Sequence, residues 1–137
     1  MAVITSVAEI AGTKNIPAPN EVGKVYEYDV VVDTSSINLA SGDFLQLCVL
    51  PPEVVVTELA IVASGTTTAT FDLGIADAEA TTAITSLYDP GTLSTTSEGA
   101  KIFGDTKSSV NRILAAEIGV AAESTVTVTV RVQYRAG

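Results

Sequence analysis

The sequence predicts an all-β domain: a two-sheet antiparallel β-sandwich, jelly-roll-like, with an extended N-terminal arm. First, apolar and polar residues alternate strictly from 125 to 134, which a pleated strand with one buried face requires. Second, the other long apolar stretches are also rich in Val, Thr and Ile, and third, turn-forming Gly, Pro, Asp and Ser separate them. Short strands between such turns are typical of sandwiches. A closed barrel needs similar strands and stays open as an alternative.

The chain divides into an arm, residues 1–20, and a single β-sandwich domain, residues 21–137. A chain of this length buries about two-thirds of its unfolded surface in one core. The two prolines of the arm each remove a backbone donor and hold the chain extended. We expect the arm to lie against the domain itself or against a neighbouring subunit. The predicted capsid or subunit contacts are Val3, Ile4, Val7, Ile10, Ile16, Pro17 and Pro19.

The first two strands of the domain differ in how many of their faces are apolar. Residues 22–32 alternate, with Glu27 and Asp29 on the polar side and an apolar side made of Tyr26, Tyr28, Val30 and Val32. After turns at 33–36 and 41–43, residues 44–50 are almost wholly apolar. A strand of this kind is buried on both faces or lies in the middle of a sheet.

The dipeptide Pro51-Pro52 ends the apolar strand, and residues 54–63 form the next one. We expect a hairpin-like reversal through the prolines, because it is the simplest connection. Residues 68–75 alternate again, with an apolar side made of Ala69, Phe71, Leu73 and Ile75.

Residues 76–108 are the least regular part of the chain. We expect a helical turn at 76–80, a turn at 88–91, and short strands around 83–87 and 101–103.

Residues 109–118 carry an ambiguous pattern. One face of a helix would hold Val110, Ile113, Leu114 and Ile118. A strand would instead alternate at Val110, Arg112 and Leu114, and we favour the strand because the neighbouring segments are strands. The final alternating strand, 125–134, has an apolar side made of Val126, Val128, Val130, Val132 and Tyr134.

Charge and hydropathy narrow the choice of partners. Seven basic residues against sixteen acidic ones give a net charge of -9, which repels nucleic-acid phosphates, so no nucleic-acid partner is expected. The acidity serves solubility or complements a basic protein surface. No apolar run approaches the roughly 20 residues of a membrane span, and the N-terminus lacks the basic start and apolar core of a signal peptide. We therefore expect no membrane partner and no export through a membrane.

The composition also argues against an enzyme. Without His, Ser-His-Asp and Cys-His sites are impossible, and the commonest transition-metal ligand is missing. Carboxylate-only catalysis would need paired acids, for which Asp72 with Asp77 or Glu79 is the nearest candidate. The same loop offers oxygen ligands for Ca²⁺ without matching the EF-hand spacing, so we favour solvated carboxylates. We expect no catalytic residue, no metal and no cofactor.

Three other features have structural explanations that we favour. Cys48, the only cysteine, lies in an apolar strand and is expected to be a small buried hydrophobe. Tyr26 and Tyr28 have the spacing to show two rings to a ligand, but such pairs more often belong to the core. Residues 99–108 contain Gly and Lys without the Gly-Lys-Ser/Thr ending of a phosphate loop, so no nucleotide site is expected.

The order of these features resembles a known family. An apolar arm leads into Val-Tyr-Glu-Tyr-Asp-Val, followed by Ser-Gly-Asp-Phe-Leu-Gln-Leu-Cys-Val-Leu-Pro-Pro. A Val-rich strand, Phe-Asp-Leu-Gly-Ile-Ala-Asp and a terminal Thr-Val-Thr-Val-Thr-Val strand complete the series. Over residues 20–135 the chain resembles the small decoration, or cement, proteins on the heads of tailed bacteriophages. Residues 76–108 have no feature matched to that family.

The resemblance implies a non-enzymatic viral structural protein, commonly a homotrimer, without cofactor or substrate. It would be made in the host cytoplasm and located on the outer capsid surface of the virion. Its partner would be the major capsid protein, bound at junctions between subunits. The main alternative is a carbohydrate- or receptor-binding β-sandwich module of a fibre or adhesin, against which the scarcity of aromatic residues counts.

Overall fold

The computed structural model describes residues 3–4, 24–33, 40–77, 83–96, 98–102, 108–120 and 126–136. Within these residues the chain forms strands and no helix. In chain order the strands are β1 (Val3–Ile4), β2 (Val25–Asp33), β3 (Phe44–Leu50), β4 (Val54–Ala63), β5 (Thr70–Ala76), β6 (Thr85–Tyr88), β7 (Glu98–Lys101), β8 (Arg112–Val120) and β9 (Thr127–Ala136).

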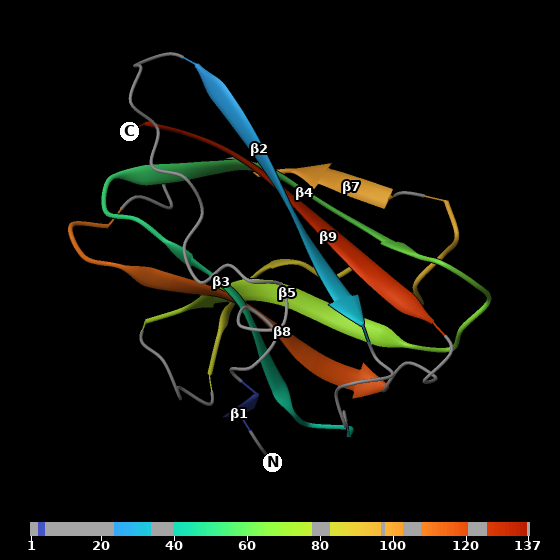
Figure 1. Ribbon diagram of the computed structural model, residues 1–137. Helices are drawn as coiled ribbons and strands as arrows, with labels where there is room; N and C mark the ends of the chain where they lie inside the picture. The colour runs from blue at the N-terminus through green and yellow to red at the C-terminus, as the bar shows by residue number, and fades with distance from the viewer. Residues whose placement is uncertain are drawn as a thin grey trace.

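The strands form two packed layers, as Figure 1 shows. One layer is a five-stranded sheet with the order β1-β3-β8-β5-β6, and the other is a four-stranded sheet with the order β2-β9-β4-β7. All neighbouring strands are antiparallel apart from β1, which runs parallel to β3. The predicted all-β sandwich is confirmed, and the two open sheets replace the alternative of a closed barrel.

The order of pairing is that of a jelly roll. β5 pairs with β6, β4 with β7, β3 with β8 and β2 with β9, so the chain doubles back on itself like one long hairpin. The hairpin then rolls up, because β8 also pairs with β5 and β9 with β4. Eight strands arranged in this way close two Greek keys over a shared core.

The core lies between the two sheets and follows the predicted alternation. In β9, Val128, Val130 and Val132 are fully buried, and the residues between them are half-buried or exposed. In β2, Val30 and Val32 are buried in the same cluster, while the tyrosines of that strand pack against its margin. The predicted inward faces of both strands are confirmed, as is the inward face of β5.

The five-stranded sheet is apolar on its inner face and also on part of its outer face. Almost every residue of β3 is buried, as predicted for the run 44–50. The inner residues of β8 join the main core, whereas Ile113 and Ala115 form a second cluster with Ala76 on the other face. Residues 112–118 of the ambiguous segment 109–118 are therefore a strand, and the helix-like spacing arises because Ile113 on its outer side is apolar as well.

The predicted hairpin through the prolines is wrong. β3 belongs to the five-stranded sheet and β4 to the four-stranded sheet, so Pro51, Pro52 and Glu53 carry the chain from one layer to the other. Glu53 has a φ of 63° and its amide donates a hydrogen bond of 2.8 Å to the carbonyl of Ser108. Proline has no backbone N–H to donate to the hydrogen bonds of a hairpin. The connection between the two sheets requires no such donor.

The irregular region contains its two predicted strands, displaced by one to three residues. They are β6 at Thr85–Tyr88 and β7 at Glu98–Lys101. The turn after β6 has Gly91 at a φ of 75°, with its amide donating to Asp89 Oδ1. Of the predicted helical turn at 76–80, Ala76 ends β5 instead, and 78–80 lie outside the described residues.

The turn before β3 forms as expected. Gly42 adopts a φ of 89°, a conformation that side chains with a Cβ rarely adopt, and its amide donates to the carbonyl of Ile118 at 2.7 Å. Asp43 Oδ2 accepts from the amide of Ala40 at 2.9 Å. The earlier predicted turn at 33–36 lies outside the described residues after Asp33.

Candidate functional site

The start of the N-terminal arm forms an edge strand of the five-stranded sheet. Val3 is the register partner of Phe44, and Ile4 that of Leu45. These two predicted contact residues therefore pair with the domain of their own chain. The other five, Val7, Ile10, Ile16, Pro17 and Pro19, lie outside the described residues.

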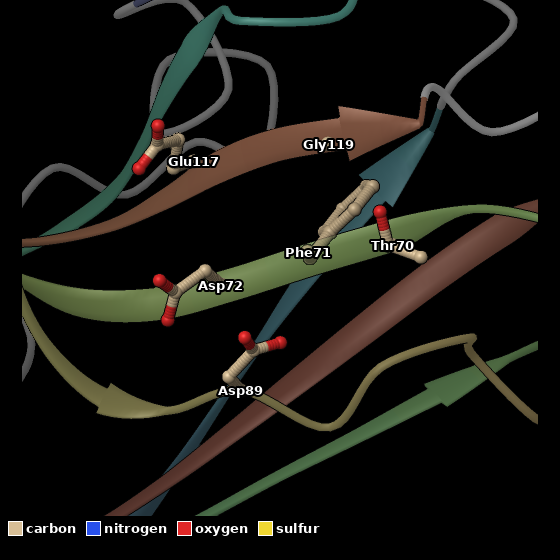
Figure 2. A pocket seen from close by; sticks show the side chains of 6 residues that line it. All are labelled: Thr70, Phe71, Asp72, Asp89, Glu117 and Gly119. Carbon is tan, nitrogen blue, oxygen red and sulfur yellow. The ribbon is translucent and has the colours of Figure 1, made fainter.

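An acidic pocket of about 250 Å³ opens on the outer side of the five-stranded sheet. Figure 2 shows that Asp72 comes from β5, Glu117 from β8, and Asp89 from the segment after β6. Asp72 and Glu117 are register partners on neighbouring strands. Thr70, Phe71 and Gly119 complete the lining. The topology thus brings together three carboxylates that are far apart in the sequence.

Asp72 and Thr70 of this pocket have partners within the domain. Ser86 Oγ donates to Asp72 Oδ1 at 2.5 Å, and the amide of Val120 donates to Thr70 Oγ1 at 2.9 Å. The one ring of the lining, Phe71, is fully buried in the core, so the pocket shows no aromatic platform to a sugar. Its chemistry is that of an acidic, solvated surface that attracts cationic groups.

The acidic cluster weighed in the sequence, Asp72 with Asp77 or Glu79, does not come together in the described residues. Asp77 makes an ion pair of 2.8 Å with Arg112, whereas Asp72 accepts from Ser86, so the two carboxylates have different partners. Glu79 lies outside the described residues. In the part of the chain that the structure describes, no group of three or more His, Cys, Asp or Glu side chains is placed to hold a metal ion.

The outer face of the four-stranded sheet carries a network of charges between β2 and β9. Arg131 Nε lies 2.8 Å from Asp29 Oδ1 and 3.2 Å from Glu27 Oε1. Gln133 Nε2 donates to the other oxygen of Glu27 at 3.0 Å. The hydrogen bond and charge of Asp29, with the charge of Glu27, raise the pKa of Arg131. Arg131 thus pairs with both acids of the neighbouring strand, while Arg135 donates to the carbonyl of Ala136.

The tyrosines of β2 belong to the margin of the core, as expected. Tyr26 stacks on Tyr134 with ring centroids 5.8 Å apart and an angle of 21° between the ring planes. Lys24 Nζ lies 5.5 Å from the centroid of the Tyr26 ring. Tyr28 also packs against the main core. The rings are therefore used for packing, which accounts for their spacing on one face of the strand.

Cys48 is buried, as the sequence predicts. Burial raises the pKa of its thiol to about 12, because the interior disfavours the thiolate. The thiolate is the nucleophilic form of cysteine, so this residue is inert at neutral pH.

Four large apolar residues are exposed in the described part of the chain: Val25, Val31, Val110 and Val120. Two of them, Val25 and Val31, lie on β2, the edge strand of the four-stranded sheet. Among the residues that the structure describes, no helix has the length and hydropathy to cross a membrane.

No protein-family model matches the chain, and no curated protein matches it by sequence. Its fold is similar to that of a chain in the capsid of Ralstonia phage GP4, with a TM-score of 0.73 and 18% identity over 100% of this chain and 99% of that chain.

Two other solved structures are similar to this fold with lower TM-scores. A chain in the acidic stable capsid structure of Helicobacter pylori bacteriophage KHP30 has a TM-score of 0.58 and 16% identity, covering 84% of this chain and 88% of that chain. A chain of the cyanophage Pam1 capsid has a TM-score of 0.50 and 17% identity, covering 92% and 96%. At these identities the likenesses establish the fold.

Proposed function

We propose that the protein is a non-enzymatic structural component of a bacteriophage virion that decorates the outer capsid surface and stabilises the shell. Its partner is the major capsid protein, which it binds at junctions between subunits as a homotrimer. The observation that carries the proposal is the likeness to a chain of the Ralstonia phage GP4 capsid, which extends over essentially the full length of both chains. A sandwich that only shared a few strands would match over less of its length.

The described surface supports a passive role. The acidic pocket has its hydroxyl groups engaged in hydrogen bonds within the domain, and the one thiol is buried and protonated at neutral pH. The outer face of the four-stranded sheet offers charged and small side chains on a stable scaffold. Such a surface suits binding to another protein better than conversion of a substrate.

The proposed mechanism is mechanical. Packing of DNA into a head generates internal pressure, and a protein bound across a junction opposes separation of the two subunits that it touches. Binding to the assembled shell, and not to separated subunits, stabilises the shell by mass action. Because the contact is repeated over many copies, a modest interface energy per copy is sufficient.

The arm supplies part of the proposed contact. Among the described residues of the arm, Val3 and Ile4 are the two that pair with β3, and a two-residue strand contributes little to the fold. Deleting residues 2–19 should therefore leave a folded domain with a native circular dichroism spectrum and weaken its binding to heads by at least about tenfold. Loss of the native spectrum would show instead that the arm is part of the fold.

The direct test uses heads of the phage whose genome encodes this chain, prepared with the gene deleted. Purified protein added to these heads should co-sediment to saturation and raise the temperature at which the heads release DNA. In light scattering the free protein should have three times the 14.1 kDa mass of one chain. Heads that neither bind the protein nor gain heat resistance would refute the proposal, and a monomer retained by immobilised glycans would favour the fibre or adhesin module.

A further inference from the structure

The strands that end the two sheets are not equally protected against pairing with another chain. β1 has two residues, and β6 and β7 have four each. β6 also has a register shift against β5. Short strands and irregular pairing protect the edges of a sheet against pairing with another chain. β2, in contrast, has nine residues and keeps a continuous register with β9 along its whole length.

The outward side of β2 has apolar residues at both ends and acids between them. Val25 is 53% exposed and Val31 is 47% exposed. Glu27 and Asp29 lie between them on the same face of the strand, because side chains alternate along it. No proline or glycine interrupts the strand. This edge is long, regular and partly apolar, which are the properties of a site for an added strand.

The charges at this edge do not balance. Among the described residues, Arg131 is the cation that contacts both carboxylates, at 2.8 Å for Asp29 and 3.2 Å for Glu27. Gln133 adds a neutral donor to Glu27. Two negative charges thus share one guanidinium, and an added cation would be attracted to the group.

A second copy of the chain fits this edge poorly. In a two-fold antiparallel pairing, the register that sets Val25 of one copy opposite Val31 of the other also sets Glu27 opposite Asp29. Like charges directly opposite each other on a sheet are destabilising. The acids in the middle of β2 therefore oppose self-pairing through the register that its apolar ends favour.

We propose that the β2 edge binds an extended segment of a different protein, which adds a strand to the four-stranded sheet. The segment carries Lys or Arg on its outward side, opposite Glu27 and Asp29, and apolar residues on its inward side. These apolar residues cover the part of Tyr28 that the core leaves half-exposed. Backbone hydrogen bonds supply affinity, and the charge pairing supplies selectivity. The inference does not rest on the proposed function.

The test uses two synthetic peptides and the full-length protein. The first is Thr-Val-Lys-Val-Lys-Val-Thr with blocked ends, and the second replaces both lysines by glutamate. Binding is measured by fluorescence anisotropy and located by amide chemical shifts. We expect the lysine peptide to bind about tenfold more tightly than the glutamate peptide, since two charge pairs change sign. The shifts should be confined to β2 and its neighbour β9.

Two variants make the test specific. Asp29→Lys replaces one of the two attractive charge pairs by a repulsive one and should abolish the preference between the peptides. Thr129→Lys is the matched control, because Thr129 is the register partner of Val31 but lies on β9, in the interior of the sheet. The control should keep the original preference.

Several outcomes would overturn the inference. They are equal binding of the two peptides, no binding of either, or amide shifts at another sheet edge. Light scattering that shows a dimer abolished by Val31→Lys would identify a second copy as the occupant. Protection of β2 amides from hydrogen exchange that disappears on deletion of residues 2–19 would identify the chain's own arm.

Discussion

The two sheets of this jelly roll differ in what covers their outer faces. In the four-stranded sheet, the outward residues of β9 are exposed or half-buried, and Arg131 is part of a solvated charge network. In the five-stranded sheet, Ile113 and Ala115 face away from the main core and are still buried. One layer thus has a single apolar face, whereas the other is apolar on its inner face and on the part of its outer face around Ile113 and Ala115. The difference shows that strict alternation marks an open sheet face, while a continuous apolar run marks a covered one.

The inward side of the four-stranded sheet offers the strongest test of this comparison. Val128 is fully buried on β9, next to the outward residue Thr129. Val128→Asp should destabilise the fold by more than about 3 kcal/mol, because it buries a charge without a partner. Thr129→Asp should change the unfolding free energy by less than about 1 kcal/mol. Urea unfolding of both variants measures this, and equal effects would reverse the assigned facing of β9.

A matched pair of alanines compares the two outer faces directly. Ala115 lies on β8 between its register partners Gln46 and Gly74, and Ala60 lies on β4 in the four-stranded sheet. Ala115→Lys should lower the unfolding free energy by about 2 kcal/mol or more, because the site is covered and a lysine side chain is too large for it. Ala60→Lys should cost less than about 1 kcal/mol, because the outer face there is open. Similar melting temperatures would show that both outer faces are solvated.

The buried thiol of the five-stranded sheet makes its stability depend on pH. Burial raises the pKa of Cys48 to about 12 from 9.0, so the folded state keeps a proton that the unfolded state loses. This stabilisation is complete below pH 9.0 and declines toward about pH 12, by about 1.4 kcal/mol per pH unit.

Cys48→Val removes the thiol. Between about pH 9 and about pH 10, the unfolding free energy of this variant should therefore fall less than that of the original protein. Burial also raises the pKa of Tyr134, with a further contribution from the charge of Cys48, so the comparison is restricted to pH values below the ordinary tyrosine pKa of 10.0. Parallel pH profiles for the two proteins would show that the thiol is not desolvated.

The charge network on the open face should have the smallest effect on stability. The side chain of Arg131 is 48% exposed, and its partners Glu27 and Asp29 are 46% and 42% exposed. Arg131→Met should therefore lower the unfolding free energy only slightly, and salt should reduce the difference further. Arg135→Met is the control on the same strand. A loss of several kcal/mol would mean that this face is not open to solvent.

The comparison also explains what the sequence alone predicts. β2 and β9 follow directly from alternation, because each has one apolar face, and their shared polar side predicts the pairing of Arg131. β6 and β7 are short, so their patterns are weak and their predicted bounds are displaced. The crossing between β3 and β4 depends on which sheet each strand joins, and distant pairings with β8 and β9 decide this.

The acidic pocket could not be predicted for the same reason. Asp72, Asp89 and Glu117 come from three segments, and only the register of β5 with β8 brings two of them together. Asp77 and Glu79 are the acids close to Asp72 in the sequence, whereas Asp89 and Glu117 are close to it only in the fold. Of the predicted arm contacts, Val3 and Ile4 pair with β3, and the capsid role of the whole set stays a prediction.

The measurement that tests the central claim most directly is electron cryomicroscopy of heads, prepared with the gene deleted and then supplied with the purified protein. The account predicts a two-layered β-sandwich in added density on the outside of the shell, lying across the boundary between major capsid protein subunits. A difference map without external density, or with the chain forming part of the continuous shell itself, would contradict it.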